Sequence, residues 1–405
     1  MDGVETLTAI RLFVGLVTAA ALVALVVRRL AIPYSVALVL LGLAVALAFP
    51  SRGFEVTPEL VLAVLLPGLV FEAAYKIDLT DLRRSFGGIA LLAAPGVIIT
   101  AAVVAIVLHL ATGLPLELGF VAGSMVAATD PVAVIATFRR LEAPRRLATL
   151  VEGESLFNDG TGLVVFAIAI RAVQSDVSGV DAVVAFGATV LVSAVIGAVA
   201  GWIASRIIAT VDDHLVELTI SLAAAYGTYL LADYFHESGV IATVVAGVVL
   251  GNYGRRIGMS EKTQEVLDVV WEFLAFLLTA LVFLLVGLAI SVPSLFEAIP
   301  SIGWGVIAVL VGRAIVVYGL LGGVSRVTRL GGRGRGIPMS WLNVMAWAGL
   351  RGAVAVAMAL SLPLGFPQRE LLQEITFGVV LFTLLVQGTT VEVVIARLGT
   401  DPDDA

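Results

Sequence analysis

The 405-residue sequence contains no cysteine and only three histidines. The missing cysteines exclude disulfides, thiolate metal sites and cysteine nucleophiles. His109, His214 and His236 lie far apart, and none belongs to an H-x-x-x-H pair, so we expect no histidine metal site. Charge is also scarce, because Asp, Glu, Lys and Arg make up 14% of the chain, whereas soluble domains carry about a quarter.

Apolar residues take the place of the missing charge. They make up 60% of the sequence, and the mean hydropathy is +1.07. These values predict an all-α polytopic membrane protein. The acidic residues Asp2 and Glu5 precede the first apolar run and Arg28-Arg29 follow it. This order favours a first transmembrane helix over a signal peptide, which needs a basic start and a cleavage site.

Apolar runs between charge clusters and Gly/Pro breaks give the predicted number of spans. A helix needs about 20 residues to cross the bilayer core. The thirteen predicted spans are residues 6–27, 34–50, 58–75, 86–111, 117–138, 147–171, 180–209, 215–235, 239–253, 265–290, 299–325, 339–362 and 371–397.

The basic residues alternate with these spans. Eighteen follow odd-numbered spans: Arg28, Arg29, Lys76, Arg83, Arg84, Arg139, Arg140, Arg145, Arg146, Arg206, Arg255, Arg256, Lys262, Arg326, Arg329, Arg333, Arg335 and Arg397. Three follow even-numbered spans: Arg52, Arg171 and Arg369. Because basic loops stay in the cytoplasm, this bias predicts an outside N-terminus and a cytoplasmic acidic tail at 399–405.

An odd number of spans fits two six-helix repeats of opposite orientation joined by one helix. In that arrangement span 5 corresponds to span 12. Span 5 contains "AATDPVAV" (127–134) and span 12 contains "AWAGLRGAVAVA" (346–357), each with a helix-disturbing feature and a charge near its middle. Paired interrupted helices of this kind indicate a binding site at the bilayer midplane. We therefore expect these two unwound helices to cross.

The break in span 5 is expected at Thr129-Asp130-Pro131, because proline has no N–H and clashes with the preceding turn. Freed carbonyls are tolerated in a membrane only where they line a cavity or bind a partner. Asp130 can balance the positive end of the following half-helix, while Thr129 offers oxygen ligands. The alternative is a plain proline kink that Asp130 caps.

Span 6 contains the polar stretch "VEGESLFNDG" (151–160). On a helix Ser155 and Asp159 share one face, as do Glu154 and Asn158. A carboxyl in the membrane interior is costly unless it is paired or hydrated, and burial raises carboxyl pKa values toward neutrality. Such a group can exchange a proton for a cation. Asp159, midway along the span, is the candidate, with oxygens of Ser155, Thr129 and Asn158 beside it.

Two arginines lie deep in apolar runs. Arg313 cannot lose its proton in practice, so it needs a buried anion, and we predict a structural ion pair with Glu154. Arg351, between Gly349 and Gly352, is predicted to offset half-helix C-terminal dipoles where spans 5 and 12 cross. The alternative for Arg351 is a side chain that extends to the membrane surface.

Weaker signals lie elsewhere. Glu72 in span 3 either lines a cation path or is an interfacial acid paired with Lys76 at i+4. The motifs Gly197-x-x-x-Gly201 and Gly247-x-x-x-Gly251 fit close helix packing, although 41 glycines make chance matches easy.

These motifs resemble, in the same order along nearly the whole chain, the NhaP/NHE-type sodium/proton antiporters, a family of monovalent cation/proton antiporters. The motifs are "LLPGLVFEAAY" (65–75), "ATDPVAV" (128–134), "EGESLFNDG" (152–160), "GRAIVVY" (312–318) and "GLRGAVAVA" (349–357). The resemblance implies a cation and proton site at Thr129, Asp130, Ser155, Asn158 and Asp159, with Na⁺ at Asp159, Ser155 and Thr129. It implies the Glu154–Arg313 bridge and an ion path at Glu72. Asn158, where electrogenic relatives carry a second aspartate, implies electroneutral 1:1 exchange.

The resemblance also implies a homodimer that works by elevator-type alternating access. The dimer domain is expected at 1–84 and, with the linking helix, at 174–292; the core domain is expected at 85–173 and 293–398. The predicted function is exchange of Na⁺ or Li⁺ for H⁺ across the cell membrane, without a cofactor and without nucleic acid. A K⁺/H⁺ antiporter of the same fold is the alternative. A cation channel is less favoured because no repeated filter appears, and we expect no enzyme activity, including that of an aspartyl protease.

Overall fold

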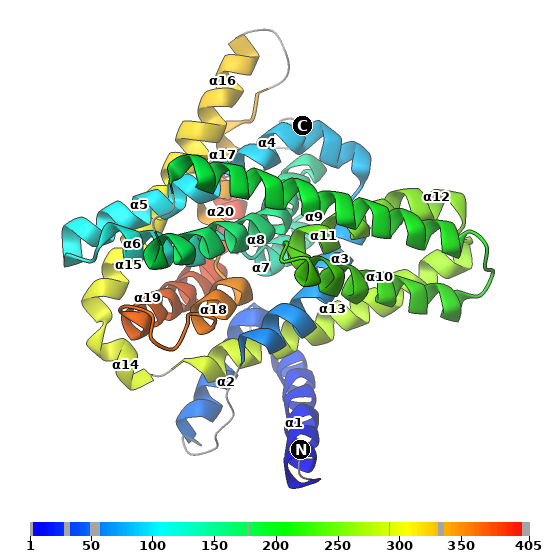
Figure 1. Cartoon of the computed structure of the whole chain (residues 1–405), viewed down its shortest axis with the longest axis horizontal. Coiled ribbons are helices and arrows are strands. Elements are labelled where there is room, and N and C mark those ends of the chain that lie inside the picture. The colour runs from blue at the N-terminus through cyan, green and yellow to red at the C-terminus, as the bar shows by residue number, and fades with distance from the viewer. Residues whose placement is uncertain are drawn as a thin grey trace.

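The computed structural model describes residues 3–27, 33–48, 57–175, 178–290, 292–330 and 336–398. Within these ranges the chain forms helices and short connections and no strand, in agreement with the predicted all-α class (Figure 1). The acidic tail 399–405 and five of the basic residues used to predict orientation lie outside the described residues: Arg28, Arg29, Arg52, Arg333 and Arg335.

The first half of the chain forms α1 (Gly3–Val27), α2 (Tyr34–Ala48), η1 (Leu60–Leu65), α3 (Leu66–Lys76), α4 (Leu79–Ala93), α5 (Pro95–Thr112), α6 (Leu116–Ala127), α7 (Val132–Arg140), α8 (Arg145–Gln174) and α9 (Gly179–Ile208). The second half forms α10 (His214–Tyr234), α11 (Gly239–Val249), η2 (Leu250–Gly254), α12 (Arg255–Ile257), α13 (Glu261–Ala289), α14 (Val292–Glu297), α15 (Ile299–Ala314), η3 (Ile315–Leu321), α16 (Gly322–Leu330), α17 (Met339–Trp347), α18 (Ala353–Leu360), α19 (Arg369–Phe382), η4 (Thr383–Gln387) and α20 (Gly388–Leu398). The η segments are single stretches of π-helix within longer helices.

Nine helices of the described chain are long and apolar enough to cross a membrane, and the helices at 14–27 and 34–48 are apolar but shorter. The protein is therefore an integral membrane protein. Two of the predicted spans, 58–75 and 339–362, are not among the nine, and the second of them is interrupted. The total of thirteen spans and the inverted repeat stay predictions.

One predicted span was placed wrongly at its start. The span predicted at 86–111 begins as α4 at Leu79, because Asp78 caps that helix by accepting hydrogen bonds from the backbone N–H groups of Thr80 and Asp81. The prediction treated the charged residues of this first part as a loop. The helix also bends between α4 and α5, where Pro95 occupies the first turn of α5.

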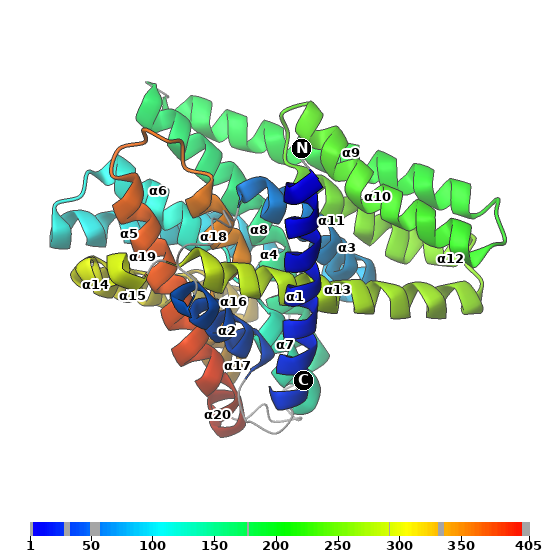
Figure 2. The ribbon, with the colours of Figure 1, turned by 90° about the horizontal axis from the view of Figure 1, so that it is seen from below.

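The helices gather into two groups that meet at α8. In one group α9, α10, α11, α3, α2 and α13 pack on one another; in the other, α4, α5, α6, α15, α18 and α19 do so. Figures 1 and 2 show α10 and α12 on one side of the molecule and α5, α15 and α19 on the other. Helix α8 contacts both groups, through α11 and α3 on one side and through α4 and α6 on the other.

Small residues bring helices into backbone contact. A Cβ built on Gly197 would lie 2.2 Å from the carbonyl oxygen of Ala242, and one built on Gly251 would lie 2.0 Å from that of Tyr75. Both small-residue motifs therefore lie at helix crossings, α9 on α11 and the α11–η2 helix on α3. These close contacts support the prediction that the two motifs serve helix packing and are not chance matches.

The close crossing of α2 and α13 predicts that adding a methyl group there lowers stability. A Cβ on Gly287 would lie 2.2 Å from the Val39 carbonyl oxygen and 2.8 Å from the Leu43 nitrogen, both backbone atoms. We expect Gly287→Ala to destabilise the folded protein by about 1–3 kcal/mol, because the helices must move apart. The measurement is the thermal unfolding midpoint in detergent. Gly227→Ala on α10, where nothing lies within 4 Å of the added Cβ, is the matched control and should leave the midpoint unchanged or raise it slightly.

Candidate cation-binding site

The two predicted helix breaks lie next to each other. Helix α6 ends at Ala127 and α7 begins at Val132, while α17 ends at Trp347 and α18 begins at Ala353. The backbone N–H of Asp130 in the first break donates to the Leu350 carbonyl in the second at 2.8 Å. The freed backbone groups of one break thus find a partner in the other, as buried non-helical backbone requires.

The half-helix ends at the two breaks carry charged side chains whose sign is opposite to that of the helix-dipole end. The Asp130 carboxylate accepts a hydrogen bond from the Val132 N–H at 3.0 Å, at the start of α7. Its second oxygen lies against Gly352, before α18, because a Cβ there would be 2.0 Å from it. Asp130 therefore lies at the positive ends of two half-helices.

Arg351 is at the opposite kind of helix end. Its guanidinium Nη1 donates to the Gly349 carbonyl at 3.2 Å, just after α17, and its backbone N–H donates to the Thr383 hydroxyl at 3.0 Å. The residue is 1% exposed, so its side chain does not extend to the membrane surface and that alternative is wrong. A guanidinium beside the last carbonyls of a half-helix is the arrangement that the helix dipole favours.

Helix α8 is tied to the first break by a buried polar cluster. The Thr129 N–H donates to Asn158 Oδ1 at 3.2 Å, and Asn158 Nδ2 donates to Thr129 Oγ1 at 2.8 Å. The hydroxyls of Thr129 and Ser155 lie 2.9 Å apart. Thr129 therefore bonds both the oxygen and the nitrogen of the Asn158 amide, so in this structure Asn158 ties α8 to the first helix break.

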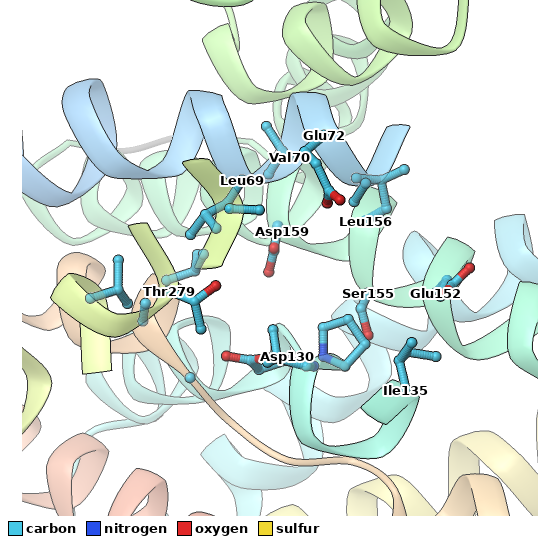
Figure 3. Close-up of a pocket in the computed structure, with 18 of the residues that line it drawn as sticks. Leu69, Val70, Glu72, Asp130, Ile135, Glu152, Ser155, Leu156, Asp159 and Thr279 are labelled. Atoms are coloured by element: carbon cyan, nitrogen blue, oxygen red, sulfur yellow. The ribbon is translucent and has the colours of Figure 1, made fainter. Parts of the chain in front are cut away.

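Asp159 differs from its polar neighbours. The structure gives its carboxyl no hydrogen bond and no ion pair with any residue that it describes. Instead, this half-buried side chain lines a cavity of about 380 Å³ together with Thr129, Asp130 and Ser155. Figure 3 shows Asp159, Ser155 and Asp130 around the same space. A carboxylate that faces a cavity without a protein partner is available to a proton or a cation.

The cavity lies between the two helix groups. Its walls come from α3, from the α6–α7 break, from α8, from α13 and from the start of α18. Its lining extends from Asp159 to Lys76 and Arg139, in the last turns of α3 and α7. It thus connects the middle of α8 with the ends of helices that carry basic residues.

Glu72 forms the predicted ion pair with Lys76 and also lines the cavity. Its carboxylate lies 2.6 Å from the Lys76 ammonium, one helical turn away. The side chain also lines the cavity, and Figure 3 shows its carboxylate directed into the space below α3. The ion pair and a place on the ion path are therefore compatible.

Glu154 and Arg313 form an ion pair in the interior. Arg313 Nη2 lies 3.0 Å from Glu154 Oε2, Nη1 contacts Oε1, and Nε and Nη2 donate to the Met345 carbonyl at 3.0 and 2.7 Å. Both side chains are buried, at 2% and 5% exposure. The pair connects α8, α15 and α17, and it lies on the face of α8 away from the cavity, which leaves Asp159 without a basic partner.

Several cavity residues were not singled out as site residues from the sequence. Glu152 precedes Asp159 by two helical turns and lines the same cavity, so helical spacing was an available signal. Glu272 and Thr279 belong to α13, and no local pattern in the sequence places α13 opposite α8. The same holds for Arg139, which was considered only as a loop charge.

Comparison with known proteins gives matches over nearly the whole chain. Residues 16–397 match the family model described as "Sodium/hydrogen exchanger, transmembrane". The chain is 40% identical over 379 residues to the Na(+)/H(+) antiporter ApNhaP of Aphanothece halophytica, covering 92% of this chain and 71% of that protein. It is 35% identical over 387 residues to the Na(+)/H(+) antiporter NhaH of Halobacillus aidingensis, covering 91% and 92% respectively.

The fold is similar to a solved structure as well. The sodium proton antiporter MjNhaP1 from Methanocaldococcus jannaschii at pH 8 superposes with a TM-score of 0.79 at 20% identity, over 97% of this chain and 99% of that chain. The resemblance predicted from the five motifs is confirmed by the family match and by the relatives. This integral membrane protein belongs to the transmembrane sodium/hydrogen exchanger family.

Proposed function

We propose that the protein is a secondary transporter that exchanges Na⁺ or Li⁺ for H⁺, with the Asp159 carboxyl holding either the proton or the cation. The observation that carries this proposal is the unpartnered carboxyl at mid-helix, facing a cavity beside two broken helices. A group that binds two ions in turn, but not together, couples their movements in opposite directions. The relatives named as Na(+)/H(+) antiporters support the same exchange and do not suggest an enzyme.

Hard monovalent cations prefer oxygen ligands. The cavity lining includes the Asp159 carboxylate, Ser155 and Thr129 with their hydroxyls, and Asp130 in the α6–α7 break. In the proposed site Asp159, Ser155 and Thr129 bind the cation, Asp130 fixes the half-helix ends, and Asn158 keeps Thr129 in place. The roles of the other charges follow: Glu154 and Arg313 hold the helices together, Arg351 stabilises the end of α17, and Glu72 lies on the ion path.

The proposed transport cycle is alternating access of the elevator type. The core domain, residues 85–173 and 293–398, carries Asp159, and the dimer domain, residues 1–84 and 174–292, supplies α3 and α13 as the facing wall. The cavity extends to Lys76 and Arg139 at the ends of α3 and α7. Because basic helix ends stay in the cytoplasm, the cavity opens to the cytoplasm in the proposed orientation. The protein then acts as a homodimer in the cell membrane, with an outside N-terminus and a cytoplasmic C-terminus, and it serves pH homeostasis.

The proposed stoichiometry is one cation per proton. Asn158 is neutral and occupied by Thr129, and Asp130 accepts a backbone hydrogen bond, so Asp159 is the one carboxyl of this cluster left without a partner. If Asp159 crosses the membrane with either one proton or one Na⁺, both loaded states carry the same net charge. The exchange is then electroneutral.

Transport in proteoliposomes tests this function. An imposed pH gradient should drive Na⁺ or Li⁺ uptake, and an imposed Na⁺ gradient should move protons, as reported by a pH-sensitive dye. Solid-supported membrane recordings of the same vesicles should show little net current. K⁺ is assayed in parallel, because a K⁺/H⁺ antiporter would respond to it preferentially. Cation flux without counter-movement of protons would identify a channel and contradict the proposal.

A further inference from the structure

We infer that Thr279 of α13 contributes an oxygen contact to the transported cation from the wall opposite Asp159, and so helps to set cation affinity in this conformation. The inference rests on the proposed function, because it concerns the same cavity. It adds a residue of the facing domain to a site otherwise built from α8 and the two broken helices.

The position of Thr279 is the first argument. It lines the same cavity as Asp159, and Figure 3 shows its side chain on the α13 wall, across the space from Asp159. Its nearest neighbours along α13 in the cavity lining are apolar: Ala275, Phe276, Val282 and Phe283. Thr279 thus places one hydroxyl among apolar neighbours on the wall that faces the carboxyl group, and the other polar residue of this wall, Glu272, lies two helical turns earlier.

The second argument is that this hydroxyl is free. Helical threonines usually donate to the carbonyl four residues earlier, as Thr112, Thr137 and Thr219 do at 2.6, 3.0 and 2.8 Å. For Thr279 the described part of the chain supplies no hydrogen-bond partner, although the residue is half-buried. The hydrogen-bonding capacity of its hydroxyl is therefore directed into the cavity.

The chemistry suits an ion that keeps part of its hydration. A hydroxyl oxygen is a hard ligand, and it can bind Na⁺ directly or accept from a water of its hydration shell. Because Thr279 belongs to the proposed dimer domain and Asp159 to the core domain, this contact exists only while the two face each other as here. Loss of the hydroxyl should therefore weaken cation binding and leave the maximal rate of the cycle nearly unchanged.

Thr279→Val tests the inference, because valine keeps the shape and removes the hydroxyl. In proteoliposomes we expect the apparent KM for Na⁺ to rise about three- to tenfold, the effect of one lost hydrogen bond, with Vmax within about twofold of wild type. Thr279→Ser should restore the wild-type KM. Thr219→Val, which removes an exposed helical hydroxyl outside the cavity, is the control and should change neither parameter.

A binding measurement separates this inference from the proposed function. Na⁺ should raise the thermal unfolding midpoint of the detergent-solubilised wild type, with a smaller rise for Thr279→Val at the same Na⁺ concentration. If the wild type shows this binding but no exchange, the proposed function fails and the Thr279 contact stands. An unchanged KM and midpoint shift in Thr279→Val, or a serine variant that stays impaired, would overturn the Thr279 contact alone.

Discussion

Asp159→Asn reduces Na⁺-driven proton movement in proteoliposomes to the level of protein-free vesicles. Asparagine has nearly the same shape as aspartate but carries no proton that can be exchanged and no negative charge for a cation. Asp159 has no protein partner in the described structure and shares its helix face with Ser155. Glu152, which also lines the cavity, lies two helical turns away, and Glu272 lies on the opposite wall, so we expect neither to replace Asp159. The measurement is the dye response to Na⁺ and Li⁺ pulses over a range of pH.

Two controls separate loss of the site from loss of the fold. Asp159→Asn should elute as the wild type does in size-exclusion chromatography and unfold at a similar temperature, but Na⁺ should no longer raise that temperature. Asp233→Asn, an exposed aspartate on α10, should exchange like wild type. Exchange by Asp159→Asn at the wild-type rate would remove Asp159 from the mechanism.

Breaking the Glu154–Arg313 pair gives the largest expected stability effect. In Glu154→Gln the Arg313 guanidinium keeps its bonds to the Met345 carbonyl but loses its buried counter-charge. Removing one partner of a buried pair destabilises a protein by about 3–5 kcal/mol. We expect a similar loss for Arg313→Met, which leaves the carboxylate unpaired, and the measurement is the unfolding midpoint in detergent.

The double variant Glu154→Gln/Arg313→Met shows whether the loss comes from an unpaired charge. It should be more stable than the sum of the single effects predicts, because neither charge remains. The exposed pair Arg140–Glu392 is the control, and Glu392→Gln should change the midpoint much less because solvent screens the charges. Additive single effects, or an equal loss at the exposed pair, would contradict the role assigned to the buried pair.

The sequence predicted the parts of the site that follow from local chemistry. Proline in an apolar helix predicts a break, and an arginine deep in an apolar run demands an acid; both Pro131 and Arg313 lie in the arrangement that these arguments require. Such arguments need no knowledge of which helices are neighbours. They also placed Glu154 and Asp159 on different faces of one helix, where the structure has them.

Features that depend on packing were not accessible in the same way. The occupation of the Asn158 amide by Thr129 depends on a rotamer and a helix separation, neither of which helical spacing determines. Thr279 lines the cavity because α13 packs on α2 and α3 and so contributes to the same cavity as α8. No local pattern in the sequence of α13 indicates this arrangement. The start of α4 was misplaced because an amphipathic helix end resembles a loop when only apolar residues are counted.

The hydrogen bond between the Asp130 N–H and the Leu350 carbonyl has a consequence for biosynthesis. A ribosome makes position 130 long before position 350, so the first broken segment enters the membrane before its partner exists. Until the late helices insert, its polar backbone must be shielded by water, by lipid headgroups or by the insertion machinery. The ion site is therefore among the last parts of the molecule to mature, and a chain truncated before α17 should be degraded rather than retained as a partly working transporter.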